Sequence, residues 1–183
     1  MLADRTARII HCADRRTARW ANGLGSTAEI ATGVASRWRF SVATLQANST
    51  FSCFSGVDRI FTVIGPHPVS LDFGAAPTVI PRLSPTSFAG ESGPDCVAAG
   101  PTEAFNVMVD RSSAAAAVEI IDAGLLFDLN ADERVAALLL VLDGRLTTDL
   151  GPVGQGDCLL VERGSVTTSG NALILKAEIF DRP

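Results

Sequence analysis

The sequence has only two histidines, and this scarcity limits the sites that it can build. His11 and His67 lie far apart, and His67 stands between two prolines in a predicted turn. Metal-dependent chemistry on a β-barrel normally needs two or three histidines with a carboxylate, because these ligands leave an open coordination position. The sequence therefore predicts no metal site, and we expect no cofactor.

The four cysteines also lack a pattern. Cys12, Cys53, Cys96 and Cys158 are scattered, and no C-x-x-C pair occurs. Scattered free thiols are typical of proteins in a reducing compartment. The N-terminus has no long apolar region behind its first charges, so we expect no secretory signal and a cytoplasmic location.

Long apolar runs and an excess of basic residues are missing as well. The apolar stretch of residues 136–142 is far shorter than the roughly 20 residues that span a bilayer. The net charge is −5, and the one basic run, Arg15, Arg16 and Arg19, is short enough to be a solvated strand end or loop. We therefore expect neither a membrane nor a nucleic acid as a partner.

Short segments that alternate between apolar and polar residues dominate what is present. Hydrophobic residues make up 47% of the chain, and most of the 16 glycines and nine prolines fall between these segments. The strand-like segments are residues 38–43, 59–64, 69–73, 105–109, 158–161 and 172–180. This spacing predicts an all-β sandwich or barrel.

Two segments within residues 112–142 leave the choice between helix and strand open. Residues 112–122 are alanine-rich, and Asn130 with Glu133 resembles a helix start, so propensity favours helices. Residues 138–142, however, are apolar on all sides, and Asp143-Gly144 resembles a hairpin turn into the following segment. A buried strand is an equal alternative for the second segment.

A weak internal repeat favours the strand and divides the chain into two halves. Residues 59–74 and 133–151 each run from a charged residue through an apolar strand and a glycine turn to a second strand that ends in Asp-x-Gly. Residues 154–157, Gly-Gln-Gly-Asp, predict a further tight turn, because glycine permits positive φ and aspartate bonds its own backbone. Each half would then be one small β-barrel.

Residues 23–28 match G-x-G-x-x-[GA], the glycine pattern of dinucleotide-binding folds. That fold requires an apolar strand before the pattern and an acid about 20 residues after it. Residues 15–22 are not apolar, and the first acid after Glu29 is Asp58, which is too far away. The glycines are better explained by a turn.

Four ordered blocks within residues 20–111 resemble the HutD/Ves family. They are W-x-N-G-x-G-x-T-x-E-I from Trp20, W-R-F-S-V-A from Trp38, F-S-x-F-x-G-V-D-R from Phe51, and F-A-G from Phe88 continued by G-P-x-x-x-F-N-V-M from Gly100. The resemblance implies a bicupin, with one cupin-like half over residues 1–111 and another over 112–183, packed as a single globular unit. It also implies an association with bacterial histidine utilisation, in which the family has been proposed to sense or bind a pathway intermediate, with no established catalytic activity.

The chain departs from the family pattern at several positions. Leu24 replaces a glycine of a triple-glycine turn, Ser49-Thr50 replaces Gly-Pro, and Ser55 replaces a proline. Ala104 replaces the acid that usually precedes Phe-Asn. If that acid contacts the ligand or positions Arg59, this protein binds a different ligand or binds it more weakly.

Arg59 is the leading candidate for ligand contact. It follows Phe51 and Phe54 in the sequence, at the start of a predicted barrel strand. Its guanidinium could hold a carboxylate by two parallel hydrogen bonds in the aromatic-lined mouth of the barrel. The alternative is an ion pair with Asp58 or Glu29 that joins strands. Arg39 is the second candidate, and alternation places it on the opposite face of its strand from Trp38 and Phe40, which leaves open which face is interior.

The remaining candidates have structural alternatives. Trp20, Asn22, Thr27 and Glu29 either line the same mouth or build a structural corner. Met108 suits core packing, whereas an inward Asn106 needs a partner or a ligand. The predicted ligand-binding residues are Arg59, Arg39, Trp20, Asn22, Thr27, Glu29, Ser41, Phe51, Phe54, Asn106 and Met108; no catalytic or metal-binding residue is predicted.

Together these features predict a metal-free bicupin that binds a small acidic metabolite of the urocanate, formiminoglutamate or formylglutamate type. By resemblance, its role would be regulatory or accessory in histidine or related amino-acid catabolism. One alternative is a metal-independent isomerase or hydrolase with Glu29 as its only candidate acid or base. Another is a structural or partner-binding protein, and flat edge strands would permit a homodimer.

Overall fold

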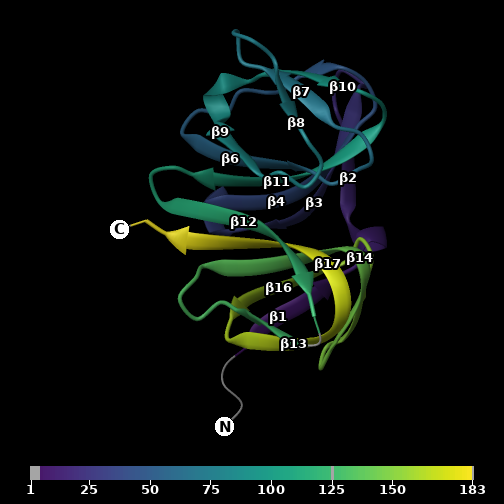
Figure 1. The fold of residues 1–183 in the computed structure, drawn as a ribbon. Helices are drawn as coiled ribbons and strands as arrows, with labels where there is room; N and C mark the ends of the chain where they lie inside the picture. The colour runs from purple at the N-terminus through teal and green to yellow at the C-terminus, as the bar shows by residue number, and fades with distance from the viewer. Residues whose placement is uncertain (1–4, 125, 183) are drawn as a thin grey trace. The chain divides into compact units, whose positions relative to one another are not determined.

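β-Strands make up almost all of the secondary structure of the computed structural model, which describes residues 5–124 and 126–182 (Figure 1). The helical elements among these residues are the short 3₁₀ turns η1 (Cys12–Asp14), η2 (Val34–Ser36) and η3 (Gly90–Ser92). No helix in the described part of the chain has the length and apolarity to cross a membrane. The all-β prediction is confirmed.

The chain forms two units, which we call the N-terminal unit and the C-terminal unit. The N-terminal unit is Arg16–Ala114, and the C-terminal unit takes the described residues of Met1–Arg15 and Ala115–Pro183. The N-terminal segment, expected in the N-terminal half, therefore lies in the other unit. Its strand β1 (Thr6–Ile10) pairs antiparallel with β16 (Cys158–Arg163), beside which Figure 1 shows it.

Two sheets make up the N-terminal unit. In hydrogen-bonded order, the first contains β2 (Arg16–Arg19), β3 (Gly25–Thr32), β4 (Trp38–Leu45), β11 (Thr102–Asp110), β6 (Val57–Val63) and β9 (Thr86–Ala89). The second contains β5 (Ser49–Thr50), β10 (Asp95–Ala98), β7 (Val69–Asp72) and β8 (Thr78–Ile80). Over the described residues both sheets are open rather than closed into a barrel.

A hydrophobic core fills the space between these two sheets. Leu45, Phe61 and Val63 come from the six-stranded sheet, and Leu71 and Cys96 come from the four-stranded sheet. Each residue follows from period-two alternation, which directs every second side chain of a strand to one face. The face of the six-stranded sheet that carries these core residues is called the inner face below.

The C-terminal unit is built around two long strands. Its sheet has the order β1, β16, β14 (Ala136–Thr148), β17 (Ser165–Asp181) and β12 (Ala114–Ala123); β13 (Leu126–Asn130) pairs with β17, and β15 (Gly151–Gly154) pairs with β14. Its core includes Leu139, Val141, Leu159, Val166 and Ile174. The predicted turn at residues 154–157 is present, since the Gly154 amide donates to Asp157 Oδ2 at 3.2 Å.

Residues 112–142 contain no helix among those described. The alanine-rich segment forms most of β12, whose pairing with β17 overrides its helix propensity. The side chains of residues 136–142 are all buried, which suits a strand covered on both faces. The hairpin turn predicted at Asp143-Gly144 is wrong, because β14 continues through these residues with a β-bulge after Val141, and the hairpin to β15 comes later.

The internal repeat has no counterpart in the strand pairing. In the C-terminal copy both predicted strands belong to the single strand β14, whereas in the N-terminal copy β6 and β7 are separate strands of different sheets. The two halves therefore share an all-β architecture without sharing the repeat.

Candidate functional site

A cavity of about 270 Å³ opens on the inner face of the six-stranded sheet, within the N-terminal unit. Its wall contains every predicted ligand-binding residue except Glu29: Trp20, Asn22, Thr27, Arg39, Ser41, Phe51, Phe54, Arg59, Asn106 and Met108. Ala21, Ala43, Thr50 and Ser52 also line it, and these were not predicted. Alternation along β4 would have identified Ala43, because it shares the face of Arg39 and Ser41.

The register of the strands explains why these residues meet. Across β4, β11 and β6, Arg39 lies opposite Met108, and Met108 lies opposite Arg59. In the adjacent row, Ser41 lies opposite Asn106. Cross-strand neighbours on one face have Cβ atoms only about 5 Å apart. The side chains of these two rows therefore form a continuous floor of the cavity. The aromatic residues of β4 face the other way, which settles the orientation of Arg39.

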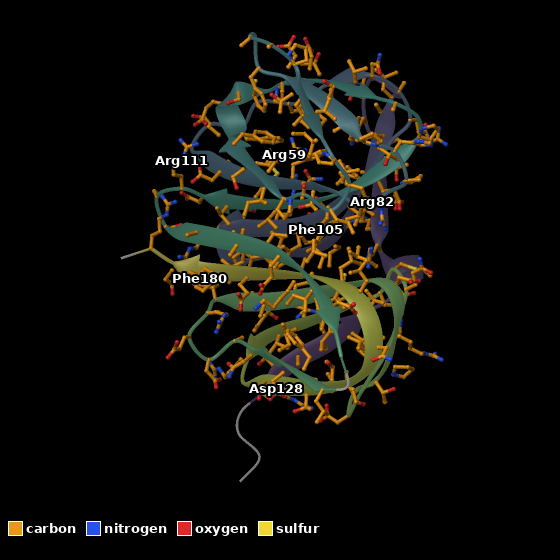
Figure 2. All side chains as sticks on the ribbon, in the orientation of Figure 1. Arg59, Arg82, Phe105, Arg111, Asp128 and Phe180 are labelled. Atoms are coloured by element: carbon orange, nitrogen blue, oxygen red, sulfur yellow. The ribbon has the colours of Figure 1, made fainter. Side chains whose placement is uncertain are left out.

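Arg59 is held by an amide and by aromatic rings. Its side chain lies in the interior of the N-terminal unit, whereas Arg111 lies at an edge (Figure 2), and Arg59 is 9% exposed. Its Nε and Nη2 donate to Asn106 Oδ1 at 2.9 and 2.6 Å. Its guanidinium carbon lies 4.3 Å from the ring centre of Phe51 and 5.5 Å from those of Phe61 and Phe88. These contacts stabilise the cation by cation–π attraction but supply no negative charge.

No carboxylate neutralises Arg59 within the described residues. Asp58 instead accepts a hydrogen bond from Arg111 at 2.6 Å, so the ion pair considered for Asp58 joins it to a different arginine. Burial, followed by the nearby positive charge of Arg39, lowers the pKa of Arg59 to about 10. The guanidinium thus stays protonated at neutral pH.

Asn106 fixes the orientation of Arg59. Its amide Nδ2 donates to the Ala104 carbonyl at 3.2 Å, which directs its oxygen toward the guanidinium. Because Asn106 Oδ1 occupies the Nε/Nη2 edge of Arg59, the edge formed by Nη1 and Nη2 remains for an anion. Ala104 is fully buried on the same face as Asn106, so the side chain that replaces the family's acid adds no charge to this floor.

Arg39 is less completely satisfied than Arg59. Its Nη2 donates to the Met108 thioether at 3.1 Å, and sulfur is a weak acceptor. Its Nε is buried without a hydrogen-bond partner. The Ser41 side chain also lines the cavity, and Ser41 is only 1% exposed. Buried polar groups in a cavity wall normally need a ligand or water.

Residues 20–27 form a structural corner that also borders the cavity. Gly23 adopts φ +71°, and the Leu24 amide donates to Asn22 Oδ1 at 3.0 Å. Trp20 Nε1 donates to Thr27 Oγ1 at 2.8 Å. A side chain at Gly25 would collide with the Trp20 ring, so this glycine allows close packing. The turn explanation for the glycine pattern is confirmed, and the two alternatives for these residues are compatible.

Glu29 lies apart from this wall. It is exposed and lines a second hollow of about 260 Å³, which shares Arg39, Phe54 and Met108 with the first cavity. Glu29 immediately precedes a β-bulge in the pairing of β3 with β4. A bulge re-aims neighbouring side chains and is not visible in the residue pattern.

Neither histidine lines the cavity. His11 Nδ1 lies 3.1 Å from Asp157 Oδ2 in the C-terminal unit, and His67 lies in a loop of the N-terminal unit. Within residues 5–124 and 126–182, no group of three or more His, Cys, Asp or Glu side chains is arranged to hold a metal ion. All four cysteines are free thiols.

Comparison with known proteins begins with sequence. The HutD family profile matches residues 12–176. Protein Ves from Cronobacter sakazakii is 36% identical over 112 residues, which cover 56% of this chain and 60% of that protein. Protein Ves from Citrobacter koseri is 34% identical over 113 residues, covering 56% and 58%. The chain thus spans about 60% of the length of the curated relatives that it matches.

Solved structures share the fold over nearly the whole chain. A conserved protein of unknown function, PA5104 from Pseudomonas aeruginosa PAO1, gives a TM-score of 0.84 at 23% identity and covers 97% of this chain and 100% of its own. HutD from Pseudomonas fluorescens SBW25 gives 0.80 at 25% identity with the same coverage. The Escherichia coli pirin YhhW, at 8% identity, shares the fold alone, with a TM-score of 0.69 over 97% of this chain and 100% of its own.

These likenesses confirm the cupin-like fold class that the sequence predicted, with open sheets in place of closed barrels. The family profile covers most of the chain, from the start of η1 to within β17. The chain belongs to the HutD family.

Proposed function

We propose that the cavity of the N-terminal unit binds a small carboxylate metabolite through Arg59, and that the protein has a regulatory or accessory role in histidine or related amino-acid catabolism. The observation that carries this proposal is a buried guanidinium with no carboxylate partner in the described part of the chain. Burying an uncompensated charge is costly, so a cavity that contains one favours an anion.

The shape of the site supports a carboxylate in particular. A planar guanidinium in a cavity wall matches the two oxygens of a carboxylate. Phe51 and Phe54 in the wall suit an apolar or planar body attached to that group. The Ser41 hydroxyl in the wall adds a donor or acceptor for a further polar atom of the ligand.

The biological role rests on the family. HutD from Pseudomonas fluorescens SBW25 has been solved in a formate condition, and formate is the smallest carboxylate. Family association with histidine utilisation makes urocanate, formiminoglutamate and formylglutamate the ligand types to test first. All three carry at least one carboxylate.

A metal-independent enzyme on the same scaffold has less support. Its candidate acid or base, Glu29, lies in the second hollow and not beside Arg59. Turnover of a bound carboxylate that is lost in Glu29→Gln would nevertheless favour the enzyme.

Thermal-shift titration with these carboxylates and formate tests the proposal. A ligand at 100 times its Kd should stabilise the folded protein by about 2.7 kcal/mol. Arg59→Gln should abolish this shift, and Arg59→Lys should weaken it, because an ammonium lacks the planar fork. Arg82→Gln is the control, since Arg82 is an exposed arginine of the same unit outside the cavity. Absence of a shift with every carboxylate, or a shift unchanged in both Arg59 variants, would overturn the proposal.

A further inference from the structure

The cavity contains a second guanidinium, and it has no negatively charged partner either. Arg39 and Arg59 both line the wall, separated by Met108 on the intervening strand. In the described residues no carboxylate oxygen lies within ion-pair distance of Arg39 or Arg59. The site thus has two positive charges for a bound molecule to neutralise.

The two guanidiniums face different places along β11. Arg59 Nη2 reaches Asn106 Oδ1, whereas Arg39 Nη2 reaches Met108 Sδ. Asn106 and Met108 are two residues apart on one strand face, which corresponds to roughly 7 Å. A single carboxylate carries one negative charge, so it would neutralise only one of these two guanidiniums.

Arg39 lies at the border between the two hollows. It lines both the first cavity and the second hollow, whereas Arg59 lines the first alone. Its buried Nε has no partner, and its thioether contact is weak compared with a charge-assisted hydrogen bond. Because Glu29 and Asp110 line the second hollow, a second anionic group would neutralise Arg39 from the side of the first cavity.

We infer that the ligand is a linear dicarboxylate, with one carboxylate on Arg59 and the other on Arg39. This inference rests on the proposed carboxylate-binding function and specifies its ligand class. Arg39 then selects acids with two carboxylates, because a monocarboxylate neutralises only one of the two guanidiniums. Ser41 lies two residues from Arg39 on the same face of β4 and opposite Asn106 on β11. Its hydroxyl would thus face the middle of such a ligand.

Calorimetric titration of the full chain with four probes tests the inference: butyrate, glutarate, 4-aminobutyrate and inorganic phosphate. A second charge-assisted pair should make glutarate bind about tenfold or more tightly than butyrate. Arg39→Gln should remove most of the preference for glutarate over butyrate, because the second guanidinium is lost. Arg39→Lys, which keeps the charge, should retain part of the preference.

Several outcomes would overturn the inference. Equal affinities for glutarate and butyrate would do so, as would a preference for glutarate that survives Arg39→Gln. Tighter binding of phosphate than of glutarate would also do so. Tighter binding of 4-aminobutyrate than of glutarate would assign the end of the ligand remote from Arg59 to Glu29. Butyrate separates this inference from the proposed function. If butyrate binds through Arg59 without a dicarboxylate preference, only the inference fails; if neither acid binds, both fail.

Discussion

Asn106 Oδ1 accepts hydrogen bonds from both Nε and Nη2 of Arg59, at 2.9 and 2.6 Å. An amide oxygen satisfies these donors without neutralising the cation. A carboxylate at the same position would satisfy them equally well and would also cancel the charge. The choice of amide over acid thus keeps Arg59 both fixed in orientation and available to an anion.

Asn106→Asp should therefore weaken carboxylate binding without unfolding the protein. The internal carboxylate competes with the ligand for Arg59, and the loss of one charge-assisted pair should weaken binding about tenfold or more. Calorimetry with butyrate measures the affinity. Urea denaturation should show a folded protein of similar stability, because the new charge-assisted pair offsets the lost hydrogen bond to the Ala104 carbonyl. Asn48→Asp adds the same charge at an exposed loop site that does not line the cavity. Unchanged butyrate affinity in Asn106→Asp would remove Arg59 from the binding site.

The corner that borders the cavity should be sensitive to added volume at Gly25. A Cβ atom there would lie 2.9 Å from two Trp20 ring carbons and closer still to the Thr44 carbonyl oxygen. Gly25→Ala should destabilise the fold by about 1–3 kcal/mol, as overpacking does. Urea denaturation measures this, and Gly124→Ala, where the added methyl meets open space, is the matched control. Equal stabilities of the two variants would contradict the packing described for Trp20.

Much of the site could be predicted because its residues follow simple rules. Alternation along β4 places Arg39, Ser41 and Ala43 on one face, and family motifs mark Arg59 and Asn106. Alternation alone leaves open which face is interior. That choice depends on the opposing sheet, which contributes residues such as Leu71 and Cys96 to the core over the inner face.

Other features depend on long-range pairing that a local pattern does not carry. The alanine-rich residues of β12 form a strand because β17 supplies hydrogen-bond partners. The Asp143-Gly144 pair sits within β14, where a bulge and Gly144 at φ +81° bend the strand without ending it. Pairing of β1 with β16 joins residues about 150 positions apart, so the sequence division at residue 111 could not assign β1.

The four thiols should divide into two reactivity classes. Cys12 and Cys53 are exposed, whereas burial raises the pKa of Cys96 to about 11 and that of Cys158 to about 12. A thiol reacts as its thiolate, so at pH 8 a chromogenic disulfide reagent should modify two thiols in the folded protein and all four in denaturant. Cys12→Ser should halve the fast amplitude. Rapid modification of Cys96 in the folded protein would contradict its place in the core.

Glu91 should make stability depend on acid pH. The hydrogen bond from Arg111, aided by the Gly56 amide, lowers the pKa of Glu91 to about 2. Because the unfolded pKa is higher, near 4.3, the ionised carboxylate stabilises the fold fully above that pH, and this contribution is lost as the pH falls toward 2. Glu91→Gln should therefore lower Tm at pH 7 and should show a shallower fall in Tm from pH 4.5 to pH 2 than the wild type.

The control for this prediction is Glu103→Gln, which removes an exposed carboxylate that has no side-chain partner among the described residues. Its Tm should follow the wild-type curve across the same pH range, because no hydrogen bond is lost. Arg111→Gln, in contrast, should flatten the acid dependence as Glu91→Gln does, since Arg111 donates to Glu91 Oε2 at 2.9 Å and to Asp58 at 2.6 Å. Parallel Tm curves for the wild type and Glu91→Gln would show that the pair contributes nothing to acid stability and that the steep dependence arises from other carboxylates, such as Asp157, whose pKa is also lowered.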